Sequence, residues 1–122
     1  MLVQYGYLSV FLFILKLLKE EKIKMKLFID VTLTKGVLNP EEVAKLIAEM
    51  PVEAGGTEGV ILSGRMPVWA FAALVHHFHP RPFVATFDPR LAGGVVVASH
   101  TEGVNVGDVV DVTDADRVEV KF

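Results

Sequence analysis

The chain has 122 residues, a formal net charge of −3 and no cysteine. This length fits one domain, which buries roughly 65% of the surface of its unfolded chain and needs no covalent cross-link. The lack of cysteine excludes a disulfide framework, a zinc–thiolate site and a cysteine nucleophile, and it suits a cytosolic protein. The negative charge argues against a protein that coats DNA or RNA, but a small anionic ligand could still be held by one or two arginines.

The first 24 residues differ in composition from the rest of the chain. Residues 2–18 are almost all apolar, and a charged segment, residues 19–24, follows them. The run is shorter than the about 20 residues of a spanning helix, and it lacks the charged start and cleavage site of a signal peptide. Three interpretations stay open: an extension from an unused upstream start codon, an added helix that packs on a partner, or a membrane tether. Because Met25 looks like the natural start of a cytosolic α/β domain, we expect a domain of residues 25–122 that does not need residues 1–24.

Local patterns predict the element order β-α-β-α-β-β-β after this extension. Apolar residues alternate over residues 27–34, which is typical of a strand. Asn39 and Pro40 begin a helix that ends at Pro51, and a second helix over residues 68–78 ends at a proline-containing segment. The other predicted strands are residues 59–62, 83–87, 95–98, 109–112 and 118–122. The pattern indicates a single α/β domain with a mixed sheet, a parallel βαβ portion and two main helices.

Polar clusters follow three of these predicted strands: residues 63–65 (Ser-Gly-Arg), residues 88–90 (Asp-Pro-Arg) and residues 99–100 (Ser-His). Ligands of open α/β sheets bind beyond the carboxyl ends of the strands, so we expect the three clusters to share one rim. The first cluster also precedes a helix, whose N-terminal amides favour a phosphate that Arg65 can contact in bidentate fashion. Each cluster taken alone is also compatible with an ordinary turn or helix cap.

Histidines gather at the end of the second predicted helix. His76 and His79 are three residues apart and therefore face the same way. Together with a nearby carboxylate, they would suit a divalent metal such as manganese. The alternative is that they only interact with the negative end of the helix dipole.

The motifs, taken in order and spacing, resemble a known family. They are the run of residues 63–69, the histidine cluster, residues 82–85, residues 88–91 (Asp-Pro-Arg-Leu), the valine strand of residues 95–97, Ser99-His100 and Gly107-Asp108. This series resembles the third class of CRISPR-associated ring nucleases, distant relatives of the CRISPR-associated Rossmann-like sensor domains. The resemblance covers about residues 25–112. The N-terminal extension and the turn Ala92-Gly93-Gly94 depart from the family pattern, and neither contains a candidate site residue.

The resemblance implies a cytoplasmic homodimer that binds cyclic tetra-adenylate and cleaves it with manganese to short linear products, which switches off the CRISPR response. It implies no role for DNA or a membrane. Two dimers can sandwich the ring, so one active site can draw residues from both. The implied site residues are, for catalysis, His79, Asp88 and Arg90; for the metal, His76, His79 and Asp88; and for the ligand, Ser63, Gly64, Arg65, Ser99 and His100.

The chemistry needs only proton transfer and charge stabilisation, because an RNA linkage carries its own nucleophile, the 2′-hydroxyl. His79 is the candidate general acid or base, since an imidazole ordinarily titrates near neutrality. Asp88 would orient it or hold the metal, and Arg90 would stabilise the developing charge, an effect of ~3 kcal/mol in analogous oxyanion sites. Two alternatives stay open: a module that binds the cyclic nucleotide without cutting it, and a manganese-dependent exonuclease of linear RNA 3′ ends.

Overall fold

The computed structural model describes the backbone of residues 2–122 and the side chains of residues 6–17 and 25–122. Every strand and helix predicted within residues 25–122 is present, with ends shifted by a few residues, so the predicted α/β class is confirmed. The elements in chain order are α1 (Leu2–Lys24), β1 (Lys26–Thr32), the 3-10 helix η1 (Pro40–Glu42), α2 (Val43–Ala48), β2 (Gly59–Gly64), α3 (Val68–His77), β3 (Phe83–Asp88), β4 (Gly93–Ser99), β5 (Val109–Asp111) and β6 (Asp116–Lys121).

The strands form one mixed sheet in the order β5-β4-β3-β2-β1-β6. β6, β1, β2 and β3 run parallel, whereas β4 is antiparallel to both of its neighbours. The crossovers that carry α2 and α3 make β1, β2 and β3 parallel, since parallel neighbours need a long connection. β3 and β4 are joined by residues 89–92 alone, which is too short for a crossover and makes a hairpin.

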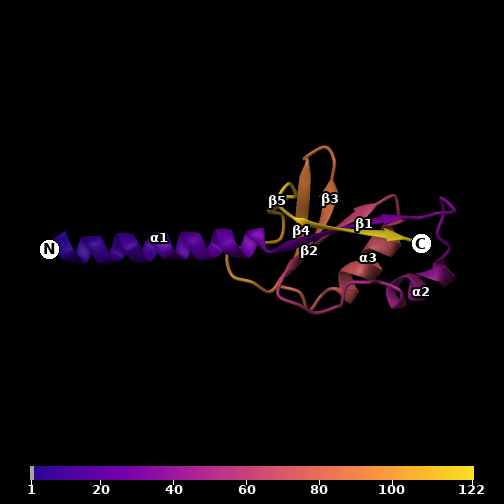
Figure 1. Ribbon diagram of the computed structural model, residues 1–122, viewed down its shortest axis with the longest axis horizontal. Helices are drawn as coiled ribbons and strands as arrows, with labels where there is room; N and C mark the ends of the chain where they lie inside the picture. The colour runs from indigo at the N-terminus through magenta and orange to yellow at the C-terminus, as the bar shows by residue number, and fades with distance from the viewer. Residues whose placement is uncertain (1) are drawn as a thin grey trace.

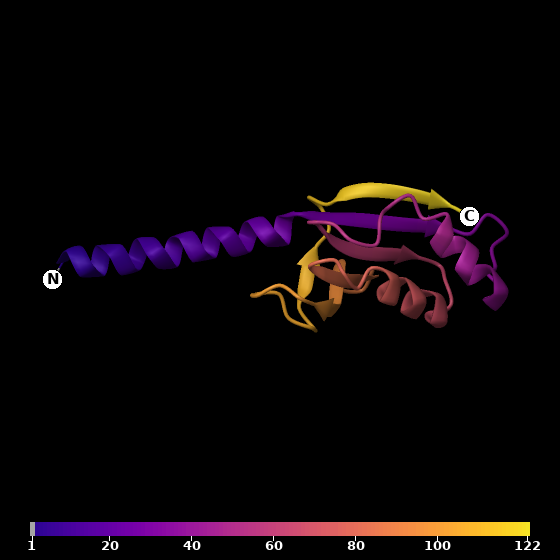
Figure 2. The same cartoon turned by 90° about the horizontal axis from the view of Figure 1, so that it is seen from below.

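The two faces of the sheet carry separate apolar cores because successive side chains of a strand point to opposite faces. Helices α2 and α3 cover one face, as Figures 1 and 2 show. The core beneath them contains Ile29, Val31, Leu46, Val60, Leu62, Leu74, Phe78 and Val84. The other face carries a smaller cluster formed by Phe28, Ile61, Phe83, Ala85, Val96, Val104 and Val110. No described helix covers this second face, so polar side chains near the carboxyl ends of β1 and β2 reach solvent.

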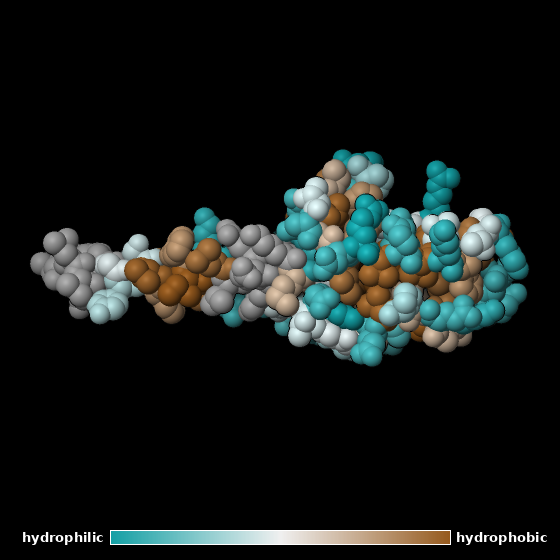
Figure 3. Space-filling view, in the orientation of Figure 1, coloured by the Kyte–Doolittle hydropathy of each residue, from teal (hydrophilic) through white to brown (hydrophobic). Residues whose placement is uncertain are grey.

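Helix α1 projects away from the domain along the long direction of the molecule (Figures 1 and 2). Its described side chains, residues 6–17, are all exposed, and Figure 3 shows apolar residues along this stretch. The apolar run therefore forms a helix, and none of its described side chains belongs to either core. Among the residues whose placement is described, no helix combines the length and the apolarity needed to cross a membrane.

Candidate functional site

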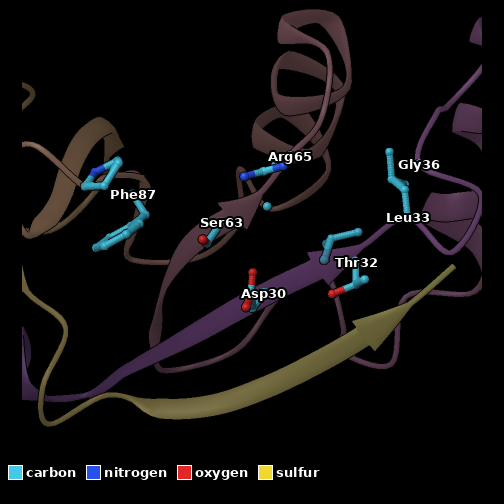
Figure 4. A pocket seen from close by; sticks show the side chains of 10 residues that line it. Asp30, Thr32, Leu33, Gly36, Ser63, Arg65 and Phe87 are labelled. Carbon is cyan, nitrogen blue, oxygen red and sulfur yellow. The ribbon is translucent and has the colours of Figure 1, made fainter.

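A cleft of about 580 Å³ opens at the carboxyl ends of β1, β2 and β3 (Figure 4). This is the edge at which parallel α/β sheets bind ligands, and the volume lies in the usual range for small-molecule sites. The lining includes the predicted ligand residues Ser63, Gly64 and Arg65. The other lining residues are Asp30, Val31, Thr32, Leu33, Gly36, Phe87 and Pro89.

The turn after β2 depends on Gly64. Its φ is 137°, and a Cβ at this position would overlap the carbonyl oxygen of Val31 on the neighbouring strand. Only glycine tolerates both conditions. The chain can therefore turn sharply, which places Arg65 exposed at the rim of the cleft, just before Pro67 and the start of α3.

Asp88 and Arg90 form a bidentate ion pair beside the cleft, flanking the lining residue Pro89. The Arg90 backbone amide and Nε donate to Oδ1 of Asp88 over 2.9 and 3.3 Å, and Nη2 donates to Oδ2 over 3.1 Å. The hydrogen bonds from the Arg90 side chain, followed by that from its backbone amide, lower the pKa of Asp88 below its ordinary value. The same pairing raises the pKa of Arg90. Asp88 is therefore a carboxylate at neutral pH and is not suited to act as a proton donor.

His79 and His100 meet at the opposite edge of the sheet. Nδ1 of His79 lies 3.3 Å from Nε2 of His100, and the two rings are edge-to-face with centroids 4.4 Å apart. The His100 backbone amide donates to the carbonyl of Pro82 over 2.8 Å, just before β3 begins. Two imidazoles in contact can share a proton, because one ring nitrogen donates while the other accepts.

The expectation that Ser99 and His100 share a rim with the other two clusters is wrong. β4 runs antiparallel, and Ser99 pairs with Phe83, the first residue of β3. The carboxyl end of β4 therefore lies at the edge where the parallel strands begin. The Ser99 hydroxyl, moreover, donates to the carbonyl of Val104 over 2.6 Å, which holds the following loop.

The predicted catalytic and metal residues are likewise divided between the two edges. His76 is exposed in the last turn of α3, and its carbonyl accepts the backbone amide of His79 over 3.3 Å. Asp88 and Arg90 lie at the far end of β3, a six-residue strand that spans about 16 Å. Within the described part of the chain, no three His, Asp or Glu side chains are grouped so as to hold a metal ion. The donors of a single chain therefore do not fit the manganese site that the resemblance implies.

Two cleft residues were not singled out from the sequence, namely Asp30 and Phe87. Oδ2 of Asp30 lies 3.9 Å from Nη2 of Arg117, whose guanidinium is 4.8 Å above the ring of Phe28. Phe28 in turn contacts Phe87 edge-to-face, with centroids 5.3 Å apart. The available signal for Asp30 was an acidic residue between the apolar residues Ile29 and Val31 of a predicted strand.

The fold is that of a small α/β domain, and its cleft lies at the carboxyl edge of the parallel strands of a mixed sheet. Residues 31–111 match the family described as CRISPR-associated protein (Cas_csx3), and the chain belongs to this family. An uncharacterised protein of Aquifex aeolicus (strain VF5) is 49% identical over 51 residues, which is 42% of this chain and 46% of that relative. The chain thus matches less than half the length of this relative. The predicted CRISPR association is confirmed, and the nuclease activity stays a prediction.

Proposed function

We propose that this CRISPR-associated protein is a ring nuclease, a metal-dependent phosphodiesterase that cleaves cyclic tetra-adenylate to short linear oligoadenylates and so ends the immune response. The observation that carries the proposal is the cleft, with Arg65 at its rim and Arg90 beside it, on a chain of net charge −3. An exposed arginine at the rim of a cleft on an acidic protein favours a small anion over a long nucleic acid. For a member of a CRISPR-associated family, a small cyclic RNA is an anion that meets this requirement.

Phosphate binding is assigned to the segment that joins β2 to α3. The first backbone amides of a helix have no partner within the helix, and the residue preceding α3, Pro67, offers no side-chain cap. These amides and the Arg65 guanidinium together favour a phosphate oxygen. The Ser63 hydroxyl lies in the same cleft and can donate a hydrogen bond to another part of the ligand.

Cleavage is assigned to groups on both edges of the sheet. The 2′-oxygen attacks the adjacent phosphorus while the bond to the 5′-oxygen breaks, and the proton of the 2′-hydroxyl passes to the imidazole of His79. The leaving 5′-oxygen takes up a proton from water, so the products are a 2′,3′-cyclic phosphate and a 5′-hydroxyl. The contact with His100 orients that imidazole and can pass a proton onward. Arg90 stabilises the negative charge that builds up on the phosphate oxygens.

Because these groups are divided between the edges, we propose that the site is completed by a second copy of the chain. The edge with His79 of one protomer would face the edge with Asp88 and Arg90 of another, a head-to-tail contact with the ring between them. The predicted metal ligands His76, His79 and Asp88 would come together only in such an assembly.

A non-catalytic module that holds the cyclic nucleotide is the second candidate. One specific observation favours it: the cleft is formed within a single chain, whereas His79 and Asp88 of that chain are separated by the length of β3. Such a module would need Ser63 and Arg65 but not His79.

Incubating the pure protein with cyclic tetra-adenylate and manganese, and resolving the products by chromatography and mass spectrometry, tests these assignments. A ring nuclease yields linear oligoadenylates and stops when a chelator removes the metal. A binding module retains the ring intact in a stable complex. An exonuclease leaves the ring intact but shortens linear oligoadenylates from their 3′ ends. Failure to bind or cut the ring contradicts the proposal.

A further inference from the structure

We propose that the inner part of the same cleft selects the base of the bound nucleotide, with Asp30 and Ser63 recognising the edge of adenine and Phe87 stacking on its face. This inference rests on the proposed function and names the residues that choose the base. It concerns binding alone and does not depend on how the ring is cut.

Asp30 and Ser63 are in-register partners on the adjacent parallel strands β1 and β2. In-register side chains of neighbouring strands project from the same face, and such strands lie about 4.8 Å apart. A carboxylate and a hydroxyl therefore stand side by side in the cleft (Figure 4). The carboxylate only accepts hydrogen bonds, whereas the hydroxyl can donate one. The pair is complementary to a ligand edge on which a donor lies next to an acceptor.

The Asp30 carboxylate is available to a ligand. The distance of 3.9 Å to Nη2 of Arg117 is too long for a hydrogen bond, so this arginine offsets part of the negative charge without occupying the oxygens. Arg117 is shared with Glu119, whose Oε1 lies 3.7 Å from its Nε. The Asp30 side chain is 31% exposed, which places it within reach of a bound molecule.

Phe87 provides an aromatic wall for the same cleft. Its half-buried ring packs edge-to-face against the buried Phe28, which is covered in turn by the Arg117 guanidinium. This packing restricts the ring of Phe87. An aromatic side chain held in place beside a basic rim is the usual platform for stacking a base of a single-stranded nucleic acid.

The distribution of charge sets the orientation of a nucleotide in the cleft. A phosphate is attracted by Arg65 at the rim and repelled by the carboxylate of Asp30. The base is therefore directed toward Asp30 and Phe87, and the sugar–phosphate toward Arg65.

Adenine fits this arrangement because its amino group at position 6 donates beside a ring nitrogen that accepts. The amino group would donate to Asp30, and the ring nitrogen would accept from Ser63. Guanine and hypoxanthine carry a carbonyl oxygen at position 6, which in the orientation given for adenine would be directed at the carboxylate and repelled by it.

Calorimetric titration without metal tests the inference, using cyclic tetra-adenylate and the corresponding rings built from hypoxanthine or guanine nucleotides. The wild-type protein should bind the adenine ring about 10- to 100-fold more tightly than either of the others, the range for one hydrogen bond to a charged group. The Asp30→Ala protein should lose this preference. The Asp30→Asn protein, which keeps an acceptor but gains a donor, should bind the hypoxanthine ring better than the wild type does.

Glu119→Gln is the matched control, because it removes the other carboxylate near Arg117 without altering the cleft. This variant should keep the full preference for adenine. Phe87→Ala should weaken the binding of all three rings by a similar factor, whereas Phe87→Tyr should bind them as the wild type does. Melting temperatures of all variants show whether each is folded.

The outcomes separate the two proposals. Base selection is overturned if the wild type binds the three rings equally or binds the guanine ring more tightly. It is also overturned if the folded Asp30→Ala protein keeps the preference for adenine. Such results leave the cleavage of cyclic tetra-adenylate untouched. Failure of the wild type to bind any of the rings overturns both the proposed function and this inference.

Discussion

His79 and Asp88 lie at opposite edges of the sheet, near the two ends of β3. His79 precedes the strand and contacts His100 at 3.3 Å, whereas Asp88 ends the strand and pairs with Arg90 at 3.1 Å. The strand between them spans about 16 Å, so the two side chains cannot act on one phosphate within a single chain. A reaction that needs both must use two protomers.

Mixing inactive variants tests this requirement. His79→Ala and Asp88→Ala should each slow cleavage of cyclic tetra-adenylate at least ~100-fold, the range for losing acid–base assistance, while binding changes far less. A mixture of the two variants should regain part of the activity, because some sites then combine an intact His79 with an intact Asp88. The double variant mixed with either single variant is the control and should stay inactive. If both single variants cut at the wild-type rate, the catalytic assignment is wrong; if both are inactive and their mixture stays so, the shared site is wrong.

Arg65→Ala should weaken binding of the ring by about 1.5–3 kcal/mol, which is the contribution of a hydrogen bond to a charged group. Arg65→Lys should recover part of this loss, since it restores the charge but not the bidentate geometry. Lys45→Ala is a suitable control because Lys45 is exposed and pairs with Glu49 outside the cleft. A calorimetric titration in which Arg65→Ala binds as tightly as the wild type would refute the role of Arg65 in phosphate binding.

The pairing with Arg90 lowers the pKa of Asp88, so the contact stabilises the folded state above the ordinary aspartate pKa. This contribution is lost as the pH falls through the lowered pKa of the folded protein. An NMR titration of the Asp88 carboxyl carbon should show a midpoint below that of an ordinary aspartate. In Arg90→Ala the midpoint should move upward. An unchanged midpoint in that variant would show that Arg90 does not hold Asp88 in solution.

A protein that begins at Met25 should fold, form dimers and cleave the ring as the full chain does. The described side chains of α1 are all exposed, and neither apolar core contains any of them. β1 starts at Lys26, which is buried and paired with Asp114 at 3.0 Å, so the domain is anchored after the extension. Circular dichroism melting, sizing and the cleavage assay check this expectation. Loss of folding or of cleavage would mean that residues 1–24 are structural.

The elements of this domain could be predicted because their signals are local. Alternating apolar residues such as Leu27, Ile29 and Val31 identify β1, and Pro67 marks the start of α3. The direction of β4 also has a local cause, because the short connection from Asp88 to Gly93 makes a hairpin. The expectation of one shared rim ignores this connection, and Ser99 and His100 therefore lie at the other edge of the sheet.

The sequence by itself determined the strands, the helices and the turns that carry Arg65, Asp88 and Arg90, since each depends on a few neighbouring residues. Only the tertiary structure decided that Asp30 stands beside Ser63 and that His79 is far from Asp88 but next to His100. Strand order, direction and register arise from pairing between segments that are distant along the chain. A shift of one residue in that pairing would turn Asp30 to the other face, so its place in the cleft is a property of the assembled sheet.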